Sequence, residues 1–177
     1  KKKVFFSDKQ IILESIKSKN NSLSKDLKLN IINEQSKSKI SNKLLIKNIT
    51  IDSKVTKKND IFFAIKGKKV DGNRFVNEVL QKKASLAIVN RINKNCAISK
   101  QIKVKNSLNF LTKCSSIYRD NISAKVISIT GSCGKTTLKE MIGYVLKKIS
   151  NTTYSPKSFN NKYGVPLSLF NLKQNDD

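Results

Sequence analysis

The chain has 177 residues, with 36 lysines and arginines against 12 aspartates and glutamates, so its formal net charge is +24 and its pI is near 10.1. It contains no histidine, which excludes any mechanism within this chain that needs an imidazole base or metal ligand. The apolar share of 38% can support a core, and the length suits one domain or one domain with part of another. No apolar run approaches the roughly 18 residues that a membrane helix requires, so we expect no membrane insertion.

The positive charge comes almost entirely from lysine, because the chain has only three arginines. Proteins that read nucleic acids usually rely on arginine for bidentate contacts and on aromatic side chains for stacking, and both are sparse here. The composition therefore argues against a nucleic-acid partner and favours a solvated, lysine-rich surface. A positive field would still attract a ligand that carries phosphate. A basic, non-catalytic module that binds nucleotides or nucleic acid remains the alternative.

The three cysteines, Cys96, Cys114 and Cys133, are far apart and odd in number, and they form no CxxC pair. This pattern argues against a disulfide framework or a zinc site. It favours a reducing compartment, and we expect the protein to be cytoplasmic.

Residues 1–43 are rich in lysine, serine and asparagine, and the sequence assigns them poorly. Within them, apolar residues at helical spacing from Ile11 to Lys19 predict one amphipathic helix, and residues 36–39 are interpreted as a loop. From Leu44 onward, strands alternate with helices, which is typical of an α/β layer architecture. The predicted strands cover residues 44–51, 61–65, 84–89 and 102–104, and the predicted helices lie around residues 75–80 and 108–118.

Residues 121–124 are the best candidate for a domain boundary. A buried strand is predicted after them, over residues 126–130, and then a glycine loop and a long helix. The helix is predicted because apolar residues recur at helical spacing, and we expect their stripe to pack as core on a sheet. These residues are Leu138, Met141, Ile142, Val145, Leu146 and Ile149.

The glycine loop, TGSCGKTT over residues 130–137, carries the strongest chemical signal. Gly131 and Gly134 allow a tight bend in which backbone N–H groups converge on a phosphate, and the helix start adds partial positive charge. Lys135 can reach the β and γ phosphates, and the Thr136 hydroxyl can ligate Mg²⁺. The motif is shorter than the full G-x-x-x-x-G-K-[ST] pattern, because Ile129 stands where the first glycine would fall. The alternative is a glycine-rich turn with an exposed lysine.

A second cluster, SFNNKYGVPL over residues 158–167, pairs Asn160 with Asn161 before Gly164 and Pro166, which we interpret as a backbone turn. On chemistry alone, an ordinary asparagine-rich loop is the favoured interpretation.

Taken together, TGSCGKTTLKEM over residues 130–141, FNN over 159–161 and GVPL over 164–167 resemble the Mur ligases, the ATP-dependent amide ligases of peptidoglycan synthesis. The upstream half is similar too. IDSK over residues 51–54 resembles the Asp-Ser-Arg element of the family's UDP-binding domain, and DGNRF over 71–75 resembles its Asp-Gly-His-x-Phe. Three residues depart from the family pattern, namely Lys54 for arginine, Asn73 for histidine and Ser158 for asparagine.

The resemblance implies a small N-terminal α/β domain that binds a UDP substrate, over residues 44–122. It implies that residues 123–177 begin a central P-loop ATPase domain with a mainly parallel sheet, so that the chain is a fragment of a three-domain enzyme. Within the family, the motifs are most similar to the member that joins D-Ala-D-Ala to UDP-MurNAc-tripeptide through an acyl phosphate. A sister ligase that adds a single amino acid stays open. The chain alone is expected to be an inactive monomer.

The resemblance also implies roles for particular residues, with ATP and Mg²⁺ as cofactors. Lys135 would be the main charge on the phosphates and the catalytic residue, and Thr136 would ligate the metal. Ser53 and Lys54 would contact the uridine nucleotide. The ATP-binding set would be Gly131, Ser132, Cys133, Gly134, Lys135, Thr136, Thr137 and Asn160.

Overall fold

A computed structural model of the chain describes residues 10–14, 23–36, 44–156 and 159–177. The chain divides into two compact units, one formed by Lys25–Ile117 and the other by Lys1–Ser24 with Tyr118–Asp177. We call them the upstream unit and the loop unit, and each is described by itself. None of the described helices is long and apolar enough to cross a membrane.

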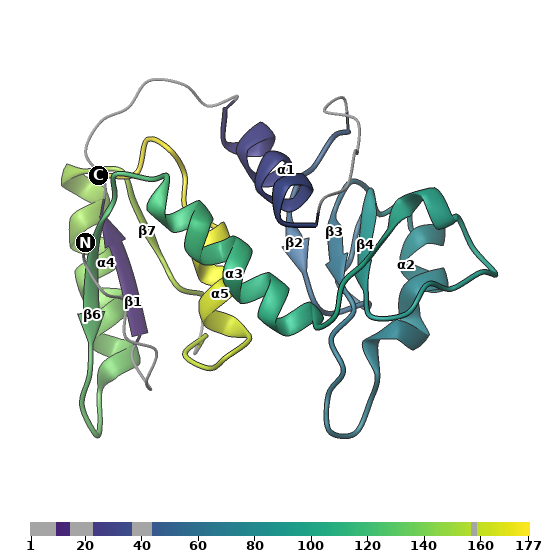
Figure 1. Cartoon of the computed structure of the whole chain (residues 1–177). Coiled ribbons are helices and arrows are strands. Elements are labelled where there is room, and N and C mark those ends of the chain that lie inside the picture. Colours follow the sequence, from purple (N-terminus) through teal and green to yellow (C-terminus); the bar gives the residue numbers. More distant parts are fainter. Residues whose placement is uncertain (1–9, 15–22, 37–43, 157–158) are drawn as a thin grey trace. The chain divides into compact units, whose positions relative to one another are not determined.

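The upstream unit is built on a parallel sheet with strand order β2-β3-β4-β5 (Figure 1). Its register places Ile61 opposite both Ile49 and Leu86. All four strands fall within or overlap the predicted segments, although they are shorter than expected. Their bounds are β2 (Ile49–Thr50), β3 (Ile61–Phe63), β4 (Leu86–Val89) and β5 (Gln101–Lys103).

A helical segment connects β3 to β4 and a short 3-10 turn lies between β4 and β5, whereas the connection from β2 to β3 contains no helix. The helix predicted around residues 75–80 is present as η1 (Gly72–Phe75) running into α2 (Val76–Gln81). The helix predicted around residues 108–118 is α3 (Ser107–Asp120). The sequence interpretation missed α1 (Leu23–Ser36), and it also missed the short η2 (Ile98–Lys100).

The core of the upstream unit is packed on both faces of β3, whose three residues are fully buried. Phe62 packs with Val76 and Val79 of α2, and the Phe63 ring lies 6.2 Å from the Phe110 ring of α3. Neighbouring residues of a strand point to opposite faces, so a strand covered on both sides reads as a continuous apolar run. The predicted α/β architecture is therefore confirmed.

The loop unit has a sheet with strand order β6-β1-β7, in which β1 (Gln10–Glu14) runs antiparallel to both neighbours. β6 (Lys125–Ile129) and β7 (Thr152–Tyr154) therefore share one direction without being adjacent. A mainly parallel sheet was expected here, whereas the parallel ladders among the described strands lie in the upstream unit. β6 is also less buried than predicted, because only Ile129 of its five residues is buried.

The helix predicted from Ile11 to Lys19 is wrong over Ile11–Glu14, because Gln10–Glu14 forms β1. The run Ile11-Ile12-Leu13 is rich in β-branched residues, and two neighbouring strands satisfy its backbone groups. The remainder of that predicted helix, and residues 37–39 of the predicted loop, lie outside the described residues.

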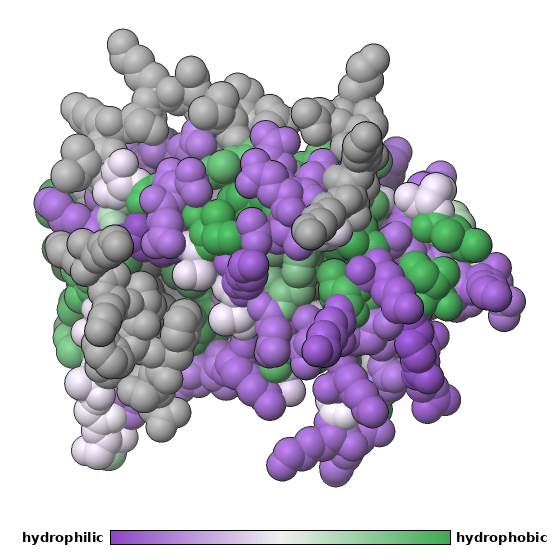
Figure 2. All heavy atoms as spheres, in the orientation of Figure 1, coloured by the Kyte–Doolittle hydropathy of each residue, from purple (hydrophilic) through white to green (hydrophobic). Residues whose placement is uncertain are grey.

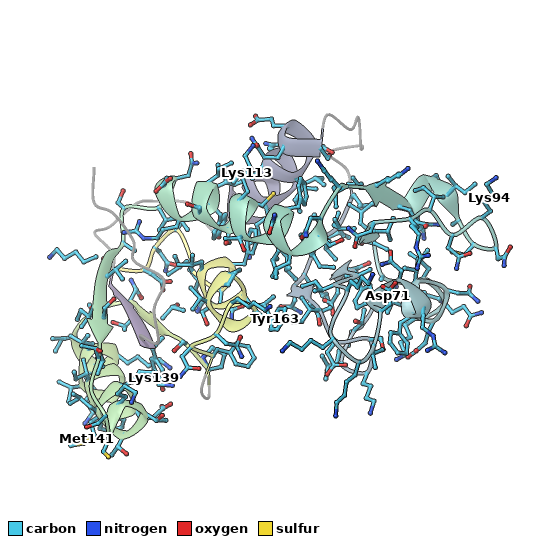
Figure 3. All side chains as sticks on the ribbon, turned by 60° about the horizontal axis from the view of Figure 1, so that its bottom comes forward. Asp71, Lys94, Lys113, Lys139, Met141 and Tyr163 are labelled. Carbon is cyan, nitrogen blue, oxygen red and sulfur yellow. The ribbon has the colours of Figure 1, made fainter. Side chains whose placement is uncertain are left out.

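α4 (Lys135–Ile149) packs on this sheet, but of the predicted apolar stripe only Ile142 and Leu146 are half-buried. Leu138, Met141, Val145 and Ile149 are between 47% and 76% exposed, so the prediction that they form core is wrong. The buried residues of α4 are instead Lys139 and Gly143. In Figure 3, Lys139 and Met141 lie on opposite sides of the helix.

The reason is a close approach between α4 and β7. A Cβ added to Gly143 would stand 2.6 Å from Cδ1 of the Tyr154 ring, so any larger residue would push the helix off the strand. The side of α4 that carries Lys139 and Gly143 therefore faces the sheet. Most of the apolar stripe is left exposed to solvent as a result. Elsewhere the surface follows the composition, and hydrophilic residues cover most of the coloured surface in Figure 2.

We expect Phe62→Ala to lower the free energy of unfolding by about 3–5 kcal/mol, because it leaves a cavity between the sheet and α2. Leu45→Ala is the matched control, since Leu45 is 62% exposed. Its effect should stay within about 0.5 kcal/mol. Urea denaturation followed by circular dichroism measures both, and equal effects would contradict the described core.

We expect Gly143→Ala to destabilise the loop unit by about 1–3 kcal/mol through overpacking against Tyr154. An ordinary exposed Gly→Ala change in a helix would instead stabilise it by about 1 kcal/mol. The same substitution in a Tyr154→Ala background removes the clash and should become stabilising. Thermal melts of the four proteins check this reversal of sign.

Candidate functional site

The loop between β6 and α4 has the backbone geometry that its glycines were expected to allow. Gly131 has a φ of +151° and Gly134 a φ of +73°, values that side-chain-bearing residues rarely adopt. A Cβ added to Gly134 would meet nothing within 4 Å, so backbone conformation, and not space, requires glycine there. Gly134 is also the N-cap of α4, and it offers no side-chain cap to the helix.

The first turn of α4 faces this loop. The hydrogen bond from Leu138 N to Gly134 O, at 2.9 Å, closes the first turn. Amides at the start of a helix lack intrahelical acceptors, and this end carries partial positive charge, so the junction favours an anion. The loop residues are exposed and accessible to a ligand, namely Gly131, Ser132, Cys133 and Gly134, followed by Thr136 and Thr137.

The Lys135 ammonium lies against the loop. Its Nζ donates to the carbonyl oxygen of Gly131 at 2.5 Å and to that of Ser132 at 3.1 Å. The side chain is half-buried, and Cγ would be 4.0 Å from a Cβ added to Gly131. The loop therefore places a positive charge beside its own exposed backbone, which is where a polyphosphate would need one.

The site is poor in metal-binding side chains. Across the described ranges, no group of three or more histidine, cysteine, aspartate or glutamate residues could hold an ion. Thr136 stands in the first turn of α4 with an exposed side chain. A single hydroxyl beside a phosphate site suits Mg²⁺, because that ion usually keeps several waters and takes its other ligands from phosphate oxygens.

The second predicted cluster is a helix start and not a simple turn. Asn161 Oδ1 accepts hydrogen bonds from the backbone N–H groups of Tyr163 (3.0 Å) and Gly164 (2.8 Å), which caps α5 (Gly164–Phe170). A Cβ added to Gly164 would stand 2.6 Å from Phe159 Cα. Pro166 is tolerated because it lies in the first turn of α5. Asn161 is therefore a structural residue.

Asn160 is half-buried in the same segment. Among the described residues no hydrogen bond joins it to the loop at Gly131–Lys135, so its predicted place at the γ-phosphate stays a prediction. Ser158 lies outside the described residues.

The sequence includes Lys139 in the motif at residues 130–141, but the motif did not reveal that this lysine is buried. This lysine is fully buried, and its Nζ donates to Ser155 O at 2.7 Å. The available signal was its spacing, because it follows Lys135 by one helical turn and so lies on the same face of α4.

The predicted uridine contacts belong to the upstream unit, in the turn after β2. Ser53 is buried, and its carbonyl accepts a hydrogen bond from Lys82 Nζ at 2.8 Å. Lys54 is exposed, and its backbone N–H donates to Asp52 Oδ1 at 2.9 Å. The carboxyl ends of parallel strands share one edge of the sheet, which is where α/β proteins bind ligands.

A polar network that the sequence did not reveal occupies the same edge after β3 and β4. Asn73 Oδ1 accepts from Asn90 N at 3.0 Å, and Asn73 Nδ2 donates to Asp71 Oδ1 at 2.7 Å. These bonds with Asn73, and then Arg91 at 2.9 Å, hold the pKa of Asp71 below its usual value. An open hollow of about 360 Å³ adjoins the network, lined by Asn73, Arg74, Arg91, Ile92, Asn93, Lys94 and Asn95 (Asp71 and Lys94 are labelled in Figure 3).

Two family models match the chain. Residues 45–119 match the Mur ligase family, catalytic domain, and residues 129–177 match the Mur ligase middle domain. The chain is 39% identical over 129 residues to the UDP-N-acetylmuramoyl-tripeptide–D-alanyl-D-alanine ligase of Buchnera aphidicola subsp. Baizongia pistaciae, covering 73% of this chain and 28% of that relative. It thus spans little more than a quarter of the relative's length.

Solved structures agree with this match. A MurF crystal structure from Acinetobacter baumannii superposes with a TM-score of 0.68 at 28% identity, covering 83% of this chain and 33% of the other. A MurF ligase from Thermotoga maritima in complex with ADP gives a TM-score of 0.56 at 31% identity, covering 73% and 30%. The two family models, the sequence relative and the two solved structures are all Mur ligases, so the chain belongs to the Mur ligase family.

Proposed function

We propose that the chain is the nucleotide-binding part of an ATP-dependent ligase that joins D-Ala-D-Ala to UDP-MurNAc-tripeptide. The observation that carries the proposal is the Lys135 ammonium held on the carbonyls of Gly131 and Ser132, at a bend whose Gly134 starts α4. Support for the substrates comes from the Buchnera ligase, whose name gives them, and for the nucleotide from the ADP complex of the Thermotoga enzyme.

In the proposed reaction, a carboxylate oxygen of the tripeptide attacks the γ-phosphorus of ATP, and ADP leaves. The amine of D-Ala-D-Ala then attacks the acyl carbon, and inorganic phosphate leaves as the amide bond forms. Such phosphoryl transfer depends on positioning and on stabilising negative charge. Lys135 and the amides of the bend supply that stabilisation within this chain.

Mg²⁺ would neutralise charge on the phosphate oxygens when it is bound. Thr136 is the residue of the described site that suits it, because it carries a hydroxyl and is exposed in the first turn of α4, beside the bend. Asn160 is the proposed contact to the γ-phosphate. Ser132, Cys133 and Thr137 would contribute through their backbone, since they surround Gly131 and Gly134 in the exposed loop.

We further propose that residues 44–122 form the UDP-substrate domain and residues 123–177 the start of the ATP domain. Ser53 and Lys54 would contact the uridine nucleotide through the turn after β2. Cys96, Cys114 and Cys133 are free thiols, which agrees with the expected cytoplasmic location.

Lys135→Ala should weaken binding of Mg·ATP to the chain by at least about tenfold, because it removes a charged hydrogen-bond donor from the phosphates. Lys148→Ala, on the same helix with its side chain exposed, is the matched control and should bind as the parent chain does. Isothermal titration calorimetry measures both. Unchanged affinity in Lys135→Ala would contradict the role given to this lysine.

Cys133 should be alkylated readily by iodoacetamide, and Mg·ATP should slow the reaction, because Cys133 lies in the exposed loop. Cys114 is the internal control, since burial raises its pKa to about 12 and it should not react in the folded chain. Mass spectrometry of the labelled peptides reports both sites. Equal labelling of Cys133 with and without nucleotide would argue against phosphate binding at the bend.

We expect no ligation from the chain alone, because it spans little more than a quarter of the length of the ligase that it matches. In a longer protein that contains the chain, we expect amide formation with D-Ala-D-Ala and not with single amino acids, measured by phosphate release across a panel of amines. Turnover with one amino acid alone would identify the sister activity instead.

A further inference from the structure

The side of α4 that faces away from the sheet is apolar. A surface helix normally turns its polar residues to water and its apolar residues to the core. In α4 the buried residues are Lys139 and Gly143, and the exposed apolar residues recur at i, i+3, i+7 and i+11, which places them together on one face. We call this the outer face of α4, and its residues are Leu138, Met141, Val145 and Ile149.

Exposed apolar surface is concentrated on this helix. Among the described residues, nine large apolar side chains are exposed, and five of them belong to α4, namely the outer face and Tyr144. The other four are spread over the upstream unit. Single exposed apolar residues are ordinary at a protein surface, whereas a group of them on one face marks a place of contact.

The last residue of the chain lies beside this face. Asp177 N donates to Asn151 O at 2.6 Å, and Asn151 N donates to Asp177 Oδ2 at 3.0 Å. Because α4 ends at Ile149, these two bonds fix Asp177 next to the end of the helix, as the position of the C label in Figure 1 shows. From Ile149 back to Leu138 the outer face is about 17 Å long, which one helix of similar length can cover.

We propose that the polypeptide that follows Asp177 in a longer protein covers the outer face of α4. The helix would then lie between the sheet of the loop unit and a second apolar layer. The lengths of the relatives support this occupant, because the chain covers 28% of the Buchnera ligase and 33% of the Acinetobacter MurF chain, and the middle-domain match runs through residue 177. The covering segment has to present apolar side chains of its own, since the outer face offers it no polar partner.

A second copy of this chain is the less favoured occupant. Each copy carries a formal charge of +24, and two such chains repel one another. The inference rests on the proposed function in one respect, namely that residues 123–177 begin a longer domain, and it does not depend on the ligation chemistry.

The test uses Met141, the one methionine of the chain, as a reporter of the outer face. Hydrogen peroxide converts an accessible methionine to its sulfoxide, and mass spectrometry of the Met141 peptide gives the rate. We expect oxidation to be at least about tenfold slower in a longer protein that contains the chain than in the chain alone, because access then requires local opening. In urea the two proteins should react at the same rate, which is the control for intrinsic reactivity.

Met141→Lys tests the same face by stability. In the chain alone the new ammonium is exposed, so the melting temperature should change by no more than about 2 °C. In the longer protein the ammonium would be buried without a partner, and we expect a fall of at least about 5 °C or a failure to fold. Ile98→Lys is the matched control, since Ile98 is an exposed apolar residue of the upstream unit, and it should have no effect in either protein.

Equal oxidation of Met141 in the two folded proteins would overturn the inference. Protection of Met141 in the chain alone that grows with chain concentration would identify a second copy as the occupant. Protection of the longer protein only in the presence of phosphatidylglycerol vesicles would identify a lipid surface. A gene that ends at Asp177 would overturn the inference as well. Amide formation by a longer protein in which Met141 stays reactive would overturn this inference and leave the proposed function intact.

Discussion

The left-handed backbone at Gly134 is the constraint on which the loop unit depends. Gly134 has a φ of +73° and stands where the short bend after β6 enters α4, whose start has no side-chain cap. A residue with a Cβ would be strained there, and the bend would open. Because the bend is tight, Lys135 falls close enough to donate to the carbonyls of Gly131 and Ser132, and the first turn of α4 faces the same space.

The position of α4 on the sheet follows from a second close contact. Gly143 allows the helix to approach the Tyr154 ring, and Lys139 holds the Ser155 carbonyl one turn nearer the loop. The helix thus meets β7 through a glycine and a lysine, while Met141 and Val145 remain exposed. The arrangement leaves apolar side chains of α4 exposed and ties the helix that begins at the bend to Ser155, the residue directly after β7.

In the upstream unit, unlike on α4, the apolar residues of the sheet and α2 are buried in a core, and polar residues lie at the edge of the sheet. Phe62 and Phe63 bury the two faces of β3, and the turns after the parallel strands meet along one edge. At that edge Asn73 bonds to Asp71 and to the backbone of Asn90, although a histidine is usual at this position in the family that the sequence resembles. In this chain the asparagine is therefore held by hydrogen bonds on both its side-chain oxygen and its side-chain nitrogen.

Much of this could be predicted from the sequence because it depends on local chemistry. The apolar runs at residues 61–65 and 84–89 indicate buried strands, and the glycines beside Lys135 indicate a phosphate loop, since strand propensity and positive φ are properties of a few neighbouring residues. Only the tertiary structure decided which face of α4 is buried, that Gln10–Glu14 is a strand, and that Asn161 caps a helix while Lys139 reaches Ser155. The buried face of α4, the strand at Gln10–Glu14 and the bond of Lys139 each depend on a contact with a distant segment or on the space beside an aromatic ring, and helical periodicity alone contains neither. The Asn161 cap is local, but an asparagine shortly before a glycine suits a turn as well as a helix start, so its role could not be read from the sequence.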